Sequence, residues 1–215
     1  MSYKTEQENF WAGKFGDDYI ARNRSDRTLS IKIANWTKNL SRIGGGLSNC
    51  LELGPNIGLN FKALGLLFPT LQMTGVEINH QAAEECAKLD RVKVIEESIL
   101  SFETDERFDL TISSGLLIHI NPDDLPTVYD KLYNYSRGYI AISEYYNPTP
   151  VEVVYRGNTG KLFKRDFAGE MMDRFSDLEL VDYGFFYHGD KAFPGGDSNW
   201  FLMRKPARRN AVSKR

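Results

Sequence analysis

The stretch that decides the fold reads Leu51-Glu52-Leu53-Gly54-Pro55-Asn56-Ile57-Gly58. A short apolar strand ends here, and a helical pattern follows from Ile57 to Phe68. Gly54 permits a tight turn and close approach of the backbone to a ligand, while Gly58 lets the helix pack closely on the strand. Pro55 fixes the backbone of the turn, and the helix N-terminus offers unpaired amides. The segment therefore predicts a ligand-binding strand–loop–helix unit.

Strands and helices alternate outward from this loop. The alternation predicts an open parallel sheet whose right-handed crossovers bring the carboxyl ends of the strands to one edge, where ligands bind. Two later strands, joined by a loop rich in glycine and proline, predict an antiparallel pair at the end of the sheet. The expected class is α/β, a doubly wound, Rossmann-like, mostly parallel seven-stranded sheet with an antiparallel last strand. The expected strands are 50–53, 71–77, 92–95, 108–113, 138–143, 178–185 and 198–203, and the expected helices 29–40, 57–68, 81–89 and 122–135, the last capped by Asn121.

Composition excludes several classes of protein. The 215 residues fit one domain, and 27 basic against 29 acidic residues give a net charge of −2, without the basic excess of a nucleic-acid binder. Cys50 and Cys86 form neither a disulfide framework nor a four-thiolate zinc site, and no metal site is expected. No apolar run is long enough to span a membrane, and the polar N-terminus is unlike a signal peptide. We expect a cytoplasmic monomer or homodimer with no nucleic-acid or membrane partner.

The sequence divides into three parts. Residues 1–40 predict an N-terminal helical cap, residues 41–205 the core, and residues 206–215 a flexible basic tail. Within the core, residues 145–175 are polar, aromatic and irregular, and they have no place in the sheet. The aromatic segment 8–23 has none either. Both segments are expected to cover the ligand edge.

Two acidic residues indicate which of two cofactors, a dinucleotide or S-adenosylmethionine, the loop would hold. A dinucleotide loop needs a middle glycine, but Asn56 would meet the pyrophosphate here. Glu52 lies two residues before Gly54 and suits a cofactor that carries an ammonium and no phosphate. Glu77, at the end of the second strand, can accept both hydroxyls of a ribose. These features favour S-adenosylmethionine over NAD(P) and over an empty glycine turn.

With these residues, the chain resembles class I S-adenosylmethionine-dependent methyltransferases over residues 45–205. The stretch 6–23 (EQENFWAGKFGDDYIARN), together with 115–122 (GLLIHINP) and 162–167 (LFKRDF), is similar to the methylases associated with pseudaminic acid biosynthesis. The resemblance implies an enzyme that methylates a small polar molecule, either a sugar of the nonulosonic type or an amino acid or amine. The alternative is a catalytically silent member that binds the cofactor or a partner. A DNA-methylating enzyme is disfavoured because its N-P-P-[YFW] tetrapeptide is missing.

The resemblance also implies further cofactor contacts. Ser98 and Ile99 leave the third strand where such enzymes hold adenine, although many have aspartate at the position of Ser98. Tyr19 is expected to close over the cofactor's carboxylate, and Arg24 to pair with it. The complete expected cofactor set is Tyr19, Arg24, Glu52, Gly54, Asn56, Gly58, Glu77, Ile78, Ser98, Ile99, Ser114, Gly115 and Leu116.

Two polar residues at the same sheet edge are the candidates for chemistry. His119 follows the fourth strand and suits acceptance of a proton from an alcohol or amine, although a structural histidine bonded to backbone is the plainer interpretation. Glu144 ends the fifth strand beside aromatic residues. This setting suits an ammonium or sugar hydroxyls of a substrate, and the alternative is a solvated strand end without a binding role. Arg156 suits a carboxylate or phosphate, or is a surface charge. The expected substrate contacts are Trp11, Tyr145, Tyr146, Tyr155 and Arg156.

Overall fold

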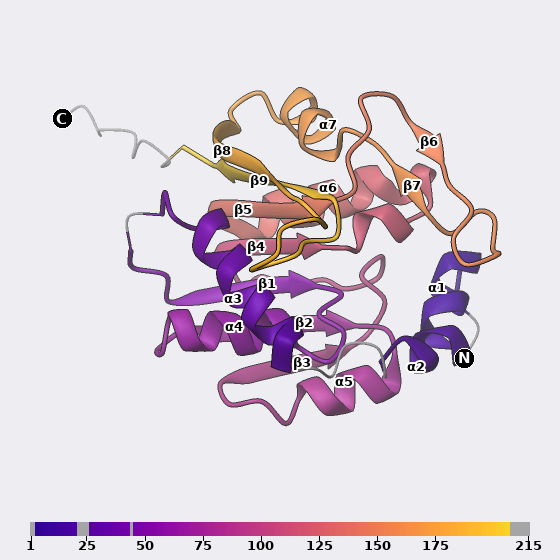
Figure 1. The fold of residues 1–215 in the computed structure, drawn as a ribbon, viewed down its shortest axis with the longest axis horizontal. Coiled ribbons are helices and arrows are strands. Elements are labelled where there is room, and N and C mark those ends of the chain that lie inside the picture. Colours follow the sequence, from indigo (N-terminus) through magenta and orange to yellow (C-terminus); the bar gives the residue numbers. More distant parts are fainter. Residues whose placement is uncertain (1–2, 21–25, 44, 207–215) are drawn as a thin grey trace.

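The computed structural model describes residues 3–20, 26–43 and 45–206, which build a seven-stranded sheet between two layers of helices (Figure 1). The strand order is β3-β2-β1-β4-β5-β9-β8. The first five strands are parallel, and β9 runs antiparallel to both of its neighbours. This arrangement confirms the predicted fold class. The strands are β1 Asn49–Leu53, β2 Gln72–Glu77, β3 Val92–Glu96, β4 Phe108–Ser114, β5 Ser136–Glu144, β8 Glu179–Phe186 and β9 Ser198–Arg204.

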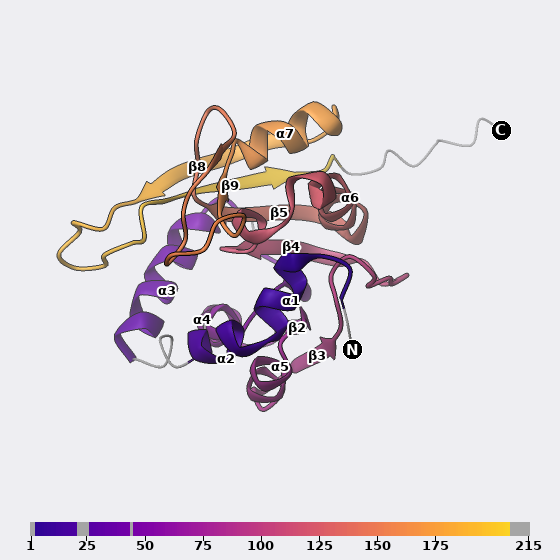
Figure 2. The ribbon, with the colours of Figure 1, turned by 90° about the vertical axis from the view of Figure 1, so that its right-hand side faces the viewer.

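Each face of the sheet has its own hydrophobic core. One core joins the sheet to α3 (Asp26–Asn39), α4 (Leu59–Leu67) and the end of α5 (His80–Cys86). The other joins it to α6 (Leu125–Tyr135) and α7 (Phe167–Arg174), as Figure 2 shows from the side. The α6 sequence places Leu125, Val128 and Leu132 three and four residues apart, so one stripe of the helix is buried. The two cores hold the strands so that their carboxyl ends form one edge.

The N-terminal segment serves two purposes. Helices α1 (Glu6–Ala12) and α2 (Lys14–Ile20) lie at the carboxyl edge of the sheet, where the cap was expected (Figure 2). Helix α3 instead buries Trp36 in the core beside α4, where Leu40, directly after the helix, is also buried. The cap is therefore narrower than residues 1–40, because an apolar stripe on α3 packs on the sheet. Residues 207–215 of the expected tail lie outside the described residues.

The segment 145–175 is more ordered than its sequence suggested. Strands β6 (Val151–Glu152) and β7 (Phe163–Lys164) pair as a small separate sheet near the ligand edge. Helix α7 packs Phe167 and Met171 on the sheet instead of covering that edge. Between β4 and α6 the chain forms the 3-10 helices η2 (Leu117–His119) and η3 (Pro122–Asp124), with Asn121 accepting a hydrogen bond from the Asp123 amide as the expected cap. No helix in the described residues is long and apolar enough to cross a membrane.

Candidate active site

A cavity of about 410 Å³ opens where the parallel strands end. The cap helices, α3 and the β8–β9 loop also line it, so the segments predicted to bind ligand meet in one place. Most of the predicted site residues border this cavity. They are Trp11, Tyr19, Gly54, Asn56, Glu77, Ile78, Ser98, Ile99, Ser114, Gly115, Leu116, His119, Glu144, Tyr145 and Tyr155.

The other predicted residues lie elsewhere. Arg156 and Tyr146 are exposed and do not border the cavity; the Arg156 guanidinium lies 5.7 Å from the centre of the Tyr155 ring. Gly58 faces α5, where an added Cβ would lie 2.8 Å from Cys86 Sγ, so Gly58 is a packing residue. Glu52 is fully buried and does not border the cavity, although Asn60, which donates a hydrogen bond to it, does. Arg24 lies outside the described residues.

The glycine loop is fixed by the acid at the end of β2. Gly54 has a φ of 69°, so the turn requires glycine, and an added Cβ would also press on the Leu116 side chain, at 2.9 Å from its Cδ1. Glu77 Oε2 accepts a hydrogen bond from the Asn56 amide at 2.8 Å, and its Oε1 accepts one from the Asn79 amide at 2.9 Å. Burial raises the pKa of Glu77, and these backbone donors oppose that rise. The Ile78 amide also acts on this carboxylate, which beside three backbone donors keeps acceptor capacity for a ligand hydroxyl.

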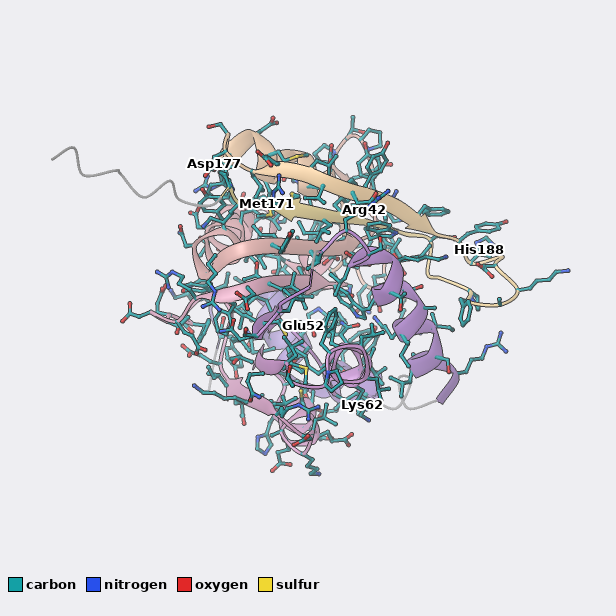
Figure 3. The ribbon with its side chains drawn as sticks, turned by 90° about the vertical axis from the view of Figure 1, so that its left-hand side faces the viewer. Arg42, Glu52, Lys62, Met171, Asp177 and His188 are labelled. Carbon is teal, nitrogen blue, oxygen red and sulfur yellow. The ribbon has the colours of Figure 1, made fainter. Side chains whose placement is uncertain are left out.

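Glu52 is fully buried at the end of β1, in the interior of the molecule (Figure 3). Its Oε1 accepts a hydrogen bond from Asn60 Nδ2, and Asn60 Oδ1 in turn accepts one from Trp36 Nε1 at 3.0 Å. This chain of bonds fixes the Asn60 amide. Within the described chain, Glu52 Oε2 has no hydrogen-bond partner. Burial raises the pKa of Glu52 to about 7.

Lys32 was not predicted from the sequence. It enters the cavity from α3 and is the only lysine or arginine among the described lining residues. It makes no ion pair or hydrogen bond with any residue that the structure describes, although Glu52 and Glu144 are near enough to raise its pKa against the lowering effect of burial. A partly buried cation without a partner is costly. Lys32 is therefore suited to the anionic group of a ligand.

Glu144 ends β5 and has two different oxygens. Its Oε1 accepts hydrogen bonds from Ser113 Oγ at 2.7 Å and from the amides of Leu116 and Leu117 at 3.0 and 3.1 Å. This oxygen holds the start of η2. Its Oε2 is buried and has no partner within residues 3–20, 26–43 and 45–206. Burial raises the pKa of Glu144 to about 7, so the carboxyl group can take up or release a proton near neutral pH.

His119 is a neutral imidazole in an aromatic setting. Its Nδ1 lies 2.6 Å from the Lys161 carbonyl oxygen, which can only accept, so Nδ1 carries the hydrogen and Nε2 the lone pair. Burial lowers the pKa of His119 to about 4. Its ring centre lies 4.5 Å from that of Trp11 and 5.0 Å from that of Tyr155. His119 is thus suited to accept a hydrogen bond and is a weak base.

The end of the cavity beside β3 is acidic. Glu8 of α1 and Asp124 of η3 border it together with Ser98, and the Ser98 hydroxyl donates to Glu8 Oε1. Burial and the charge of Glu8 raise the pKa of Asp124. The sequence carried a sign of the start of α1, because Thr5 and Glu8 have the spacing of a capping box. It carried no sign of the contact with Ser98, which is 90 residues away.

Comparison with solved structures supports the fold. The chain is 12% identical to the plantazolicin methyltransferase BpumL in complex with SAH, with 93% of this chain and 94% of that chain covered and a TM-score of 0.66. It is 17% identical to the N-methyltransferase NodS from Bradyrhizobium japonicum WM9 in complex with S-adenosylhomocysteine. The match covers 88% of this chain and 97% of that chain, with a TM-score of 0.64. It is 15% identical to the Burkholderia thailandensis 1,6-didemethyltoxoflavin-N1-methyltransferase. That match covers 95% of this chain and 93% of that chain, with a TM-score of 0.65. No protein-family model and no curated protein matches the chain.

No group of three or more metal-binding side chains occurs in the part of the chain that the structure describes. The polar groups around the glycine loop instead form a set of opposite charges. Lys32 and the free oxygen of Glu52 lie on the α3–α4 side of the sheet, and Glu77 lies one strand further along the edge. Lys32 and Glu77 can bind a ligand that carries an anionic group and hydroxyls, and the Glu52 carboxyl group behind the lining favours a cationic group beside them.

Proposed function

We propose that the protein is an S-adenosylmethionine-dependent methyltransferase that acts on a small polar acceptor. The observation that carries the proposal is that the Lys32 ammonium and the nearby Glu52 Oε2, beside a glycine loop that Glu77 fixes, have no partner within residues 3–20, 26–43 and 45–206. The amino-acid end of S-adenosylmethionine carries one carboxylate and one ammonium, and its ribose carries two hydroxyls. Lys32 and Glu52, which lack such partners among the described residues, would each gain a group of opposite charge.

The chemistry places simple demands on the chain. When bound, S-adenosylmethionine supplies a methyl group on a positively charged sulfur, which leaves as a neutral thioether. The residues of the cavity then have to align the acceptor, exclude water and remove a proton. Glu144 Oε2 is the better base, because its pKa of about 7 is closer to neutral pH than the His119 pKa of about 4. His119 Nε2 would orient the N–H or O–H of the acceptor.

The lining of the cavity narrows the acceptor class. If Lys32 binds the cofactor, the described lining offers no further cation for an acceptor, while Glu144 and the rings of Trp11, Tyr145 and Tyr155 remain. Such a surface favours an amine or a neutral hydroxyl-bearing molecule over an anion. A neutral sugar precursor of the nonulosonic type fits this chemistry, and the sequence resemblance supports it. Two of the compared proteins are N-methyltransferases by name, which supports an amine.

Calorimetry with S-adenosylhomocysteine tests the proposal. The wild-type protein should bind it and should bind NAD⁺ far more weakly. Lys32→Met, which keeps the aliphatic stem but removes the charge, should weaken binding roughly tenfold, the effect of one charge-assisted hydrogen bond. The same variant should bind 5′-deoxy-5′-(3-aminopropylthio)adenosine, which lacks only the carboxylate, as the wild type does. Lys38→Met on the exposed side of α3 is the matched control. Failure of the wild-type protein to bind S-adenosylhomocysteine would refute the proposed cofactor.

A further inference from the structure

The residues that follow β3 contact the cap through the carboxylate of Glu8. Ser98 Oγ donates to Glu8 Oε1 and accepts a hydrogen bond from the Leu100 amide at 3.0 Å. A hydroxyl has one hydrogen to donate, so Ser98 has already used it. The acceptor that lies against Ser98 at this end of the cavity is Glu8, which belongs to the cap and not to the sheet.

Glu8 is held in place from its own helix. Its Oε2 accepts hydrogen bonds from the Thr5 amide at 2.9 Å and from Thr5 Oγ1 at 3.1 Å, which completes a capping box at the start of α1. The carboxylate is thus fixed between Thr5 and Ser98 and has acceptor capacity left for a ligand. Asp124 adds a second acidic group at the same end. Such a site favours a ligand amine and opposes a ligand carbonyl oxygen.

This inference rests on the proposed function. We propose that Glu8 accepts a hydrogen bond from the exocyclic amine of adenine, so that the cap, not the strand exit, recognises the base. Glu77 at the end of β2 would take the ribose, and β3 is the next strand outward. A base attached to that ribose reaches past Ile78 toward Ser98 and Ile99. The side chain of Ile99, which is 7% exposed, offers an apolar surface for the flat ring.

The position of Glu8 couples nucleoside binding to docking of the cap. Helix α1 contacts the core through few polar bonds, among them Glu8 to Ser98 and Gln7 Nε2 to the Gly160 carbonyl oxygen at 2.9 Å. A ligand that is held by the core and bonds to Glu8 connects the core to the cap. Binding of the ligand and docking of the cap therefore strengthen each other by linkage. The same helix carries Trp11, which packs on His119. Binding of the base would therefore also close the acceptor part of the cavity.

A pair of nucleosides that differ only at the base tests the inference. S-adenosylhomocysteine carries the amine, whereas S-inosylhomocysteine carries a carbonyl oxygen in its place and a hydrogen on the neighbouring ring nitrogen N1. The wild type should prefer the first by at least roughly tenfold, because a carboxylate attracts an amine and repels a carbonyl oxygen. Glu8→Gln should bring the ratio of the two dissociation constants close to one, since an amide can serve either base. Glutamine also preserves the capping box, so α1 should still form.

The control is Glu6→Gln on the same helix, which removes an ion pair with Lys161 at 3.2 Å but no group at the base, and which should keep the wild-type ratio. Protection of residues 3–20 from protease is the second measurement. S-adenosylhomocysteine should protect them in the wild type, and the inosine compound should not. Glu8→Ala is the second variant, with the same expected loss of discrimination. An unchanged ratio in both Glu8 variants overturns the inference and leaves the proposed function standing. A wild-type protein that binds neither compound overturns both.

Discussion

At the scale of single residues, the carboxyl groups at the strand ends differ in how they are satisfied. Glu77 accepts backbone hydrogen bonds on both oxygens and so fixes the loop. Glu52 and Glu144 each leave one buried oxygen without a partner in the described chain. Burial without full compensation favours the protonated form, which explains why the pKa of each rises to about 7. A ligand that supplies the missing partner would lower these pKa values again.

The buried Glu144 carboxyl group should make the stability of the wild type depend on pH, and Glu144→Gln should remove that dependence. Between the unfolded pKa near 4.5 and the folded pKa of about 7, folded wild-type protein holds a proton that unfolded protein has released. Its free energy of unfolding therefore falls by about 1.4 kcal/mol per pH unit from this group, or about 3 kcal/mol in total. The variant lacks this fall. Urea unfolding from pH 5 to 8 should show the wild type losing stability relative to the variant up to pH 7, then no further change.

The matched control is Glu106→Gln, on the exposed loop before β4. His119 contributes with the opposite sign, because its pKa is lowered, but it is present in both proteins and cancels in the difference. A difference between wild type and Glu144→Gln that stays constant with pH would show that the carboxyl group is not desolvated in solution.

At the scale of elements, the sequence predicted the strands because periodicity and turn residues are local signals. It also placed Gly54, Glu77 and Glu144 at the correct edge, since parallel strands share their carboxyl ends. It missed α7, whose short apolar stripe lies among polar and aromatic residues. It missed Lys32 as well, because the apolar pattern of α3 says nothing about where one cation meets a cavity. Contacts such as Glu8 to Ser98 depend on docking of elements distant in the chain.

Gly58→Ala tests whether that glycine serves packing between elements. Gly58 has a φ of 78°, and an added Cβ would lie 2.5 Å from Leu89 Cδ1 and 2.8 Å from Cys86 Sγ. Backbone strain of about 1–2 kcal/mol and overpacking of about 1–3 kcal/mol should together lower the free energy of unfolding by roughly 3 kcal/mol. Gly45→Ala, with a φ of 85° and no atom within 4 Å of the added Cβ, should cost only the strain. Equal losses in urea unfolding would contradict a packing role for Gly58.

At the scale of the whole molecule, the sheet and the cap differ in how they are held. The sheet is stabilised by a continuous core on each face, whereas α1 has no buried side chain and α2 buries only that of Ile20. Hydrogen bonds of the cap to the core come from few groups, including Asn79 Nδ2 to the Trp11 carbonyl oxygen at 3.2 Å. A segment with so few buried contacts opens at a lower free energy than the core. The cavity lies between the sheet and the cap, so closure of the cavity depends on the cap, which is the less stable of the two.

Trp11→Ala separates the stability of the cap from that of the fold. Trp11 packs on His119 and Tyr155 across the cavity, so its loss should loosen the cap while the sheet unfolds within about 2 °C of the wild-type midpoint. S-adenosylhomocysteine at about 100 times its dissociation constant should stabilise the wild type by about 2.7 kcal/mol and raise the midpoint by roughly 5–10 °C. At the same ligand concentration the variant should gain less than half of that rise. A midpoint without ligand that falls as far as it does for Gly58→Ala, with the full rise retained on ligand addition, would mean that Trp11 belongs to the core and not to a separate cap.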